Sequence, residues 1–299
     1  MKSIKDTYTL NNGNKIPCVA FGTYIPFNQP QVQKQMIKDA IEVGYRYFDT
    51  ASLYGSECAL GEAIKESGID RSEFFIATKV WIDEMNEVPE AIDRSLERLG
   101  TDYIDLYLSH WPKSPDDENW KETGKNCWKE MERAVERGLI KNIGLSNYLP
   151  HHIKNILECC EIKPVVDQLE LHPGYSQYFA REYAIKNGMI PQAWSPLGRG
   201  NYDGSDEKNR DFFRMLANKY GKTVPQIFIR YQIQNGVIPV VKSKTVSRMQ
   251  ENMNVFDFAI EEDDMWMLEC MPQNTGLGEH PDFSIPNMKS NKSTLKSIT

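Results

Sequence analysis

The sequence lacks several features that mark other classes of protein. No part of its 299 residues forms an uninterrupted apolar run of the roughly eighteen residues that a membrane-spanning helix needs. Residues 1–10 are polar and lack the apolar centre of a secretory signal, so we expect a cytoplasmic protein with no membrane partner. The formal net charge is −7. Phosphate repels such a chain, which argues against a nucleic-acid partner.

Paired cysteine motifs are also missing. Six cysteines occur, but none stands in a C-x-x-C pair. A chain of this length buries about three quarters of its unfolded surface, so it needs neither disulfides nor a structural metal to hold a core. We therefore expect six reduced thiols. They are Cys18, Cys58, Cys127, Cys159, Cys160 and Cys270.

Short apolar runs alternate with longer amphipathic segments along most of the chain. This alternation predicts an α/β fold with a parallel sheet covered by helices. Eight units in a chain of this length favour a closed (β/α)₈ TIM barrel over an open doubly wound sheet. The expected strands are 19–22, 45–49, 74–79, 103–108, 142–145, 165–169, 189–193 and 237–241. The expected helices are 31–43, 58–67, 87–99, 126–137, 150–160, 177–186, 211–220, 224–235 and 247–252.

The two ends of the chain carry different signals. Residues 8–10 and 15–17 flank Asn-Asn-Gly, which predicts a β-hairpin, and we expect this hairpin to cap the N-terminal end of the barrel. Residues 274–288 are rich in glycine and proline and should form a long loop. Residues 289–299 are polar and are expected to be a disordered tail. We expect one domain over residues 1–299, since no linker interrupts the alternation.

Polar residues stand where the expected strands end. Asp49 ends one strand and Tyr54 follows it, Lys79 ends the next, and His110 follows the one after that. Barrel active sites form at the carboxyl ends of the strands, so these four side chains should meet at one rim. A lysine at the end of an apolar strand needs a partner, and Asp49 is the natural one.

This set of residue types fits the protonation of an oxygen atom. A buried ammonium at Lys79 would lower the pKa of Tyr54 and make its phenol a proton donor near neutral pH. Asp49 would hold the lysine, and a neutral His110 would donate a hydrogen bond to a carbonyl oxygen. No amino acid supplies a hydride to the carbon, so the pattern implies a nicotinamide cofactor.

Each residue also has a structural interpretation. Asp49 and Lys79 alone would suit a buried ion pair, Tyr54 a packing residue and His110 a core histidine. A metal site built from Asp49, His110 and His172, as in a metal-dependent hydrolase, is disfavoured because no H-x-H pattern or acid-rich strand end accompanies them. We therefore predict no metal. His172 is interpreted as structural, and His151 and His152 as a solvated helix face.

Three separated motifs resemble those of the aldo-keto reductase family. Residues 43–57 read VGYRYFDTASLYGSE, which is similar to the family's GYRxxDTAxxYxxE. Residues 138–147 read GLIKNIGLSN, which resembles GxxRxIGxSN, and IPVVKS at 238–243 with Arg248 and Asn252 resembles the third signature. The resemblance covers about residues 16–283, in order, and is closest to the branch of 2,5-diketogluconate reductases and prostaglandin F synthases. It implies the barrel fold and NADPH-dependent reduction of aldehydes and ketones.

The resemblance also implies a role for individual residues. Asp49, Tyr54, Lys79 and His110 fall on the family's catalytic tetrad, all four intact. Ser146, Asn147 and Gln168 fall on the residues that hold the nicotinamide carboxamide, and Trp194 on the ring that stacks against the nicotinamide. The remaining cofactor-binding positions are Gly22, Thr23, Ser195, Leu197, Gly198, Lys242, Ser243, Arg248, Glu251 and Asn252.

The choice between NADPH and NADH rests on the adenosine 2′-phosphate. Lys242 and Arg248 match the pocket for this dianion, and a guanidinium with an ammonium is the usual protein partner for it. Glu251 stands close to the same pocket and would weaken the preference. NADPH is therefore the predicted cofactor, and use of NADH stays open.

Aromatic residues follow three of the expected strands on the catalytic side. Tyr24, Trp81 and Trp111, together with His110, are predicted to line an apolar substrate pocket for a small carbonyl compound. The competing hypothesis is a redox-sensing or structural protein that binds the cofactor without turnover, which some members of this family are. We expect a monomer.

Overall fold

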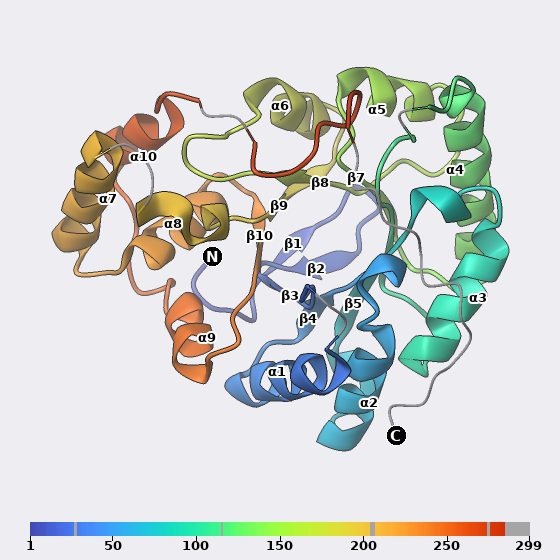
Figure 1. The fold of residues 1–299 in the computed structure, drawn as a ribbon, viewed down its shortest axis with the longest axis horizontal. Helices are drawn as coiled ribbons and strands as arrows, with labels where there is room; N and C mark the ends of the chain where they lie inside the picture. The colour runs from blue at the N-terminus through green and yellow to red at the C-terminus, as the bar shows by residue number, and fades with distance from the viewer. Residues whose placement is uncertain (27–28, 115, 204–206, 274–275, 285–299) are drawn as a thin grey trace.

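The computed structural model describes residues 1–26, 29–114, 116–203, 207–273 and 276–284, with the side chains of residues 201–203 left aside. Eight parallel strands close into a barrel in which β3 pairs with both β4 and β10 (Figure 1). The predicted fold is confirmed. The barrel strands are β3 (Ala20–Gly22), β4 (Tyr47–Asp49), β5 (Phe75–Val80), β6 (Leu106–Ser109), β7 (Ile143–Ser146), β8 (Val166–Glu170), β9 (Ile190–Trp194) and β10 (Ile238–Val241).

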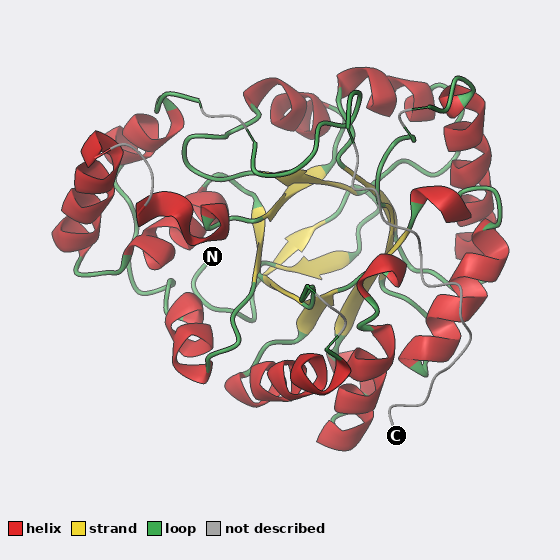
Figure 2. Ribbon diagram, viewed as in Figure 1, coloured by secondary structure: helices red, strands yellow, loops and turns green. Residues whose placement is uncertain are grey.

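Helices surround the barrel on all sides (Figure 2). They are α1 (Pro30–Val43), α2 (Glu57–Ser67), α3 (Val88–Leu99), α4 (Trp120–Glu136), α5 (Pro150–Leu157), α6 (Tyr178–Lys186), α7 (Glu207–Tyr220), α8 (Val224–Gln234), α9 (Val246–Met253) and α10 (Glu262–Glu269). No helix of the described residues has the length and apolar character that crossing a membrane requires. All six cysteines are free thiols.

Two helix predictions were wrong. Helix α4 begins at Trp120, six residues before the expected start, because its first turn is polar and its buried face begins only at Gly124. Helix α10 was missed altogether. It buries only Asp264 and Leu268 and exposes Trp266, so it carries little of the apolar period that reveals a helix.

The N-terminal hairpin closes one end of the barrel, as the turn pattern predicted. Strands β1 (Thr7–Thr9) and β2 (Lys15–Pro17) pair antiparallel. Leu10, which follows β1, and Ile16 of β2 are buried in the cluster that fills the barrel interior. Asn12 and Asn14 donate to the Asn142 side chain at 2.8 and 2.9 Å, just before β7 begins. The hairpin therefore lies at the amino ends of the strands, and the opposite rim carries the chemistry.

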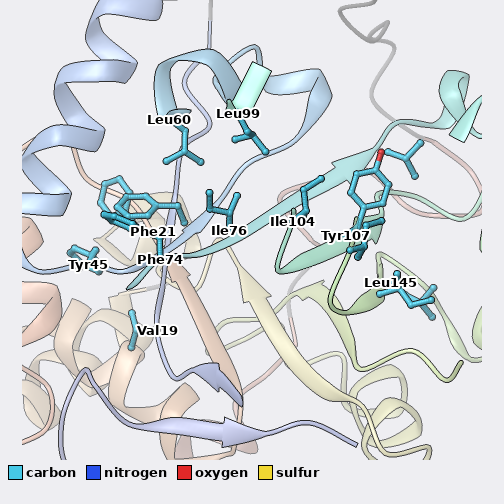
Figure 3. Close-up of a cluster of buried hydrophobic side chains, with 14 of the residues drawn as sticks. Val19, Phe21, Tyr45, Leu60, Phe74, Ile76, Leu99, Ile104, Tyr107 and Leu145 are labelled. Atoms are coloured by element: carbon cyan, nitrogen blue, oxygen red, sulfur yellow. The ribbon is translucent and has the colours of Figure 1, made fainter. Parts of the chain in front are cut away.

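A second apolar layer lies between the strands and the helices (Figure 3). Phe21, Phe74 and Ile76 point outward from the barrel side and pack toward Leu60 of α2 and Leu99 of α3. Helices α2 and α3 come unusually close here. A Cβ atom at Gly61 would lie 2.4 Å from the carbonyl oxygen of Leu99. Only glycine fits this position, because the obstructing atom belongs to the backbone.

We predict opposite effects for two glycine-to-alanine changes in helices. Gly61→Ala should lower the free energy of unfolding by about 1–3 kcal/mol, because α2 must move away from α3. Gly124→Ala in α4 meets its nearest atoms at 3.7 Å and should raise the free energy by about 0.5–1 kcal/mol. Denaturant unfolding of both variants checks this. Equal stability of the two would contradict the close contact at Gly61.

Candidate active site

Four polar side chains from three neighbouring strands meet at the carboxyl rim. The Lys79 ammonium lies 2.6 Å from Asp49 Oδ1 and donates to the Thr50 carbonyl oxygen at 2.9 Å. It also lies 5.0 Å from the centre of the Tyr54 ring. Tyr54 Oη is 3.4 Å from His110 Nε2. The structure thus brings together all four residues that the strand ends predicted.

Tyr54 is held by a short 3₁₀ helix, Ser52–Tyr54, between β4 and α2. Gly55 ends this helix with a φ of 65°, a left-handed conformation that glycine adopts without strain. Gln33 of α1 donates to the Tyr54 carbonyl oxygen at 3.3 Å, and Ser52 Oγ donates to Glu84 at 2.7 Å. The backbone of the proton-donor candidate is therefore fastened from two sides.

The Asp49–Lys79 pair is fully enclosed. The two side chains are 4% and 0% exposed. Burial lowers the pKa of Lys79, and the adjacent carboxylate of Asp49 opposes that shift. The second carboxylate oxygen of Asp49 accepts from Gln168 Nε2 at 2.8 Å. Charges this deeply buried are stable only when each is paired and hydrogen-bonded, and both conditions are met here.

The pKa of Tyr54 differs from the sequence expectation. Burial, followed by the charge of Asp49, raises the pKa of Tyr54 well above its ordinary value, whereas we expected Lys79 to lower it. The Asp49 carboxylate offsets the lysine charge at the phenol. Tyr54 is therefore a neutral phenol at physiological pH, the form that a proton donor needs. The ammonium beside it favours the phenolate once the proton leaves.

His110 is neutral, as predicted. Burial, followed by the charge of Lys79, lowers the pKa of His110 well below its usual range. Its Nε2 faces Tyr54, and its Nδ1 has no hydrogen-bond partner among the described residues. With its proton on Nε2, the neutral His110 imidazole would donate to a substrate oxygen alongside the Tyr54 hydroxyl.

The predicted substrate-pocket residues differ in exposure. The Tyr24 ring lies 5.0 Å from that of Tyr54 and is 40% exposed. Trp81 packs edge-to-face on His110 at 5.0 Å. Trp81 and Trp111 are only 1% and 5% exposed. Tyr24 is thus the ring of this set that solvent reaches, and the two tryptophans mainly support the site from within.

The four residues expected at the nicotinamide form one hydrogen-bonded group. Ser146 Oγ donates to the Gln168 carbonyl oxygen at 3.1 Å, and Asn147 Nδ2 donates to the His110 carbonyl oxygen at 3.0 Å. Trp194 Nε1 donates to Asn147 Oδ1 at 2.8 Å. Asn147 adopts a φ of 63°, which turns its side chain away from the strand direction. The amide groups of Asn147 and Gln168 therefore lie next to the tetrad.

Most of the residues expected to contact the phosphates lie just after β9 or β10. Ser195, Gly198 and Arg199 follow β9 with φ between 50° and 55°. Lys242 follows β10, and burial, Lys244 and Arg199 all lower its pKa. The groups that act on Lys242 are thus cations, an arrangement that fits a bound phosphate. The sequence prediction had missed Arg199 and Lys244, although Lys244 stands in the same Lys-Ser-Lys run as Lys242.

The other predicted cofactor contacts are placed as follows. Arg248 is exposed on α9. Glu251 accepts from Thr223 Oγ1 at 2.6 Å, so one carboxylate oxygen is already engaged. Thr23 is fully buried and donates to the Asp49 carbonyl oxygen at 3.0 Å, which makes it a support of the tetrad. The rest show no side-chain contact that decides their role: Gly22, Leu197, Ser243 and Asn252.

The interpretation of His151 and His152 as a solvated face was wrong for one of them. His152 is fully buried, and its Nε2 lies 3.0 Å from Asp282, as does Nε2 of the exposed His151. His152 Nδ1 accepts the Leu149 N–H at 3.2 Å, so Nε2 carries the proton. A metal ion binds only a deprotonated imidazole nitrogen, and Nε2 of His152 is protonated. We therefore interpret the two histidines as the attachment site of Asp282 on α5.

The comparisons with known proteins agree with this geometry. The family model described as "Aldo/keto reductase family" matches residues 19–271. The chain belongs to the aldo/keto reductase family. A glyoxal reductase from Bacillus subtilis is 36% identical over 282 residues, covering 94% of this chain and 98% of that protein. A 9,11-endoperoxide prostaglandin H2 reductase from Trypanosoma cruzi is 35% identical, covering 93% and 95%.

Solved structures of this family match over most of their length. An aldo-keto reductase from a deep-sea metagenome library superposes with a TM-score of 0.85 at 34% identity, covering 93% of this chain and 99% of that one. A Bombyx mori aldo-keto reductase in complex with NADP gives a TM-score of 0.80 at 34% identity, covering 90% and 92%. The predicted family and the oxidoreductase class are confirmed.

The buried His152 predicts a specific loss of stability in acid. Burial, followed by the charge of His151, lowers the pKa of His152 to about 4, whereas an unfolded histidine titrates near 6.5. The unfolded state then binds more protons between these values, so stability present above pH 6.5 is lost as the pH falls toward 4. Between pH 7 and pH 5 this group should cost about 2 kcal/mol.

The measurement is denaturant unfolding of wild type and His152→Asn at pH 7 and pH 5. The asparagine variant should be less stable at pH 7, and the gap should narrow by pH 5 because asparagine does not titrate. A gap of the same size at both pH values would show that His152 does not cause the acid sensitivity.

Proposed function

We propose that this chain reduces the carbonyl group of small aldehydes and ketones to alcohols, with NADPH as the hydride donor. It does so as one domain over residues 1–299, as a monomer and in the cytoplasm. The observation that carries the proposal is the 3.4 Å approach of Tyr54 Oη to His110 Nε2, directly above a buried Lys79–Asp49 pair. Two neutral donors converge there on a space beside the carboxamide-binding amides of Asn147 and Gln168.

The residues of the chain divide the work as follows. When bound, NADPH supplies the hydride that the carbonyl carbon accepts. Tyr54 and His110 hold the carbonyl oxygen, and their two donors stabilise the negative charge that develops on it. Tyr54 then transfers its proton to the oxygen. The ammonium of Lys79 stabilises the phenolate that remains, and Asp49 keeps the ammonium in place.

The chain offers a fitting site for NADPH along the same rim. Trp194 presents a half-buried indole next to Asn147, suited to stacking against the nicotinamide. Lys242, Lys244 and Arg199 gather cationic charge past the ends of β9 and β10, suited to the 2′-phosphate. Relatives solved with NADP or NADPH support this cofactor.

The proposed substrate class rests on the relatives of this chain. Relatives of this chain are named glyoxal reductase and methylglyoxal reductase. We therefore propose that small 2-oxoaldehydes are among its substrates. These molecules carry little apolar surface, so their binding would depend mainly on hydrogen bonds from Tyr54 and His110 to the carbonyl oxygen.

Tyr54→Phe should lower kcat/KM for carbonyl reduction by about 10²–10⁴, because it removes the proton donor. The assay follows NADPH absorbance with glyoxal, methylglyoxal, ketoses and quinones. Tyr24→Phe is the matched control, since it removes the hydroxyl from the adjacent ring and should retain most activity. Full activity in Tyr54→Phe would refute the role of Tyr54. NADPH binding without turnover on any carbonyl would favour a redox-sensing protein.

Removal of cationic charge should weaken NADPH binding selectively. We expect Lys242→Ala and Arg248→Ala each to raise the KM for NADPH by roughly 10-fold and to leave that for NADH nearly unchanged, since NADH lacks the 2′-phosphate. Glu251→Gln is the control of opposite sign, because it removes a negative charge, and it should strengthen NADPH binding slightly. Equal losses with both cofactors would mean that these side chains do not read the phosphate.

A further inference from the structure

The proposed chemistry leaves one buried carboxylate at the rim without a task. Glu170 is the last residue of β8 and is 3% exposed. It lies two residues beyond Gln168, so its side chain projects from the same face of the strand, nearer the rim. A buried carboxylate is costly unless several donors surround it. The question is therefore what holds Glu170 there.

The donors come from the far end of the chain. The backbone N–H of Leu277 donates to Oε1 at 2.7 Å, and that of Gly278 donates to Oε2 at 3.0 Å. His172 Nε2 lies 3.1 Å from Oε1. Two consecutive backbone amides thus grip both oxygens of one side chain, 107 and 108 residues away in sequence. Figure 1 shows this red C-terminal segment crossing beside β8 and β9 toward α5.

The two hydrogen bonds to Glu170 place Gly278 against Trp194. Glu170 and Trp194 are paired residues of β8 and β9. A Cβ atom on Gly278 would lie 2.4 Å from Trp194 Cη2 and 3.3 Å from Glu170 Oε2. At the pyrrole end of the same indole, Nε1 donates to Asn147 Oδ1 at 2.8 Å. The ring is therefore held between a hydrogen bond at its nitrogen and the backbone of Gly278 at its benzene end.

We propose that Glu170 is a positioning residue that fastens residues 276–278 to the rim and, through Gly278, fixes the orientation of Trp194. This inference rests on the proposed function, in which the nicotinamide stacks against Trp194. Glu170 touches neither cofactor nor substrate. It acts through the two backbone amides, and its loss should loosen the cofactor site without removing a catalytic group.

A second attachment of the same segment provides the comparison. Asp282 binds His151 and approaches His152 on α5, so the segment is tied at two places. Only the Glu170 attachment reaches Gly278 and Trp194. Asp282→Asn weakens the other attachment and leaves Glu170 intact, which separates general loosening of the segment from the proposed effect on Trp194.

Two variants test the two halves of the proposal. Glu170→Gln keeps the volume and sets an amide NH₂ against a backbone N–H, so one hydrogen bond is lost while the packing remains. Gly278→Ala leaves the Glu170 carboxylate and both backbone N–H groups unaltered and directs a methyl group against Trp194. Hydrogen exchange of the peptide that contains residues 276–284 reports the attachment, and NADPH fluorescence titration reports the cofactor site.

We expect the backbone amides of Leu277 and Gly278 to exchange at least 10-fold faster in Glu170→Gln than in wild type. In Asp282→Asn the same two amides should exchange at the wild-type rate. The Kd for NADPH should rise about 10-fold in both Glu170→Gln and Gly278→Ala, with kcat falling less than in Tyr54→Phe. Asp282→Asn should leave the Kd within about twofold of wild type.

Two results would overturn the proposal. Unchanged exchange in Glu170→Gln would mean that Glu170 does not fasten the segment. Faster exchange in Glu170→Gln, together with an unchanged Kd for NADPH in both Glu170→Gln and Gly278→Ala, would mean that the segment does not act on Trp194. Failure of the proposed function itself looks different, because wild-type protein would then bind no NADPH or would bind it without reducing any carbonyl, while the exchange measurement would still report the attachment.

Discussion

The ion pair between Lys79 and Asp49 is the interaction on which the rest of the site depends. It places a positive charge inside an apolar barrel, where only a carboxylate at 2.6 Å and the Thr50 carbonyl oxygen make that charge tolerable. Asp49 in turn meets Gln168, which places an amide of the cofactor group against the tetrad. The Lys79–Asp49 pair thus connects the proton-donor candidate to the amide of Gln168. Loss of either member of the pair would leave the other as an unpaired buried charge.

Much of this arrangement could be predicted from the sequence because barrel geometry converts strand ends into neighbours. Asp49, Lys79 and His110 stand at the ends of apolar runs, and parallel closure leaves them one place to meet. Prediction of helices from apolar periodicity was less successful. It missed α10, which buries only Asp264 and Leu268, and the start of α4, whose first turn is polar. Periodicity reports an element only where the element buries an apolar face.

The pKa values in the site depend on distances between side chains in space, which the spacing of residues along the sequence does not give. The pKa of Tyr54 is raised by burial, followed by the charge of Asp49, and the sequence gives neither the depth of burial nor the distance to that charge. Glu170 illustrates the same point. Its partners are the backbone N–H groups of Leu277 and Gly278. Nearly every residue type carries such a group, so the sequence does not reveal these partners. The sequence pattern predicts a surface position for His152, but the side chain is fully buried, with Trp120, Tyr148 and Asp282 around its ring.

The hairpin at the opposite end has a consequence for the order in which the chain folds. Tyr8 bonds to the Ile233 carbonyl oxygen, and Asn11 to that of Pro164, across 225 and 153 residues of sequence. The hairpin therefore cannot make both contacts until the chain has been synthesised as far as Ile233. Such distant contacts slow folding, because the chain between them must be ordered first. The hairpin is synthesised before both of its partners, so these contacts can form only late in folding.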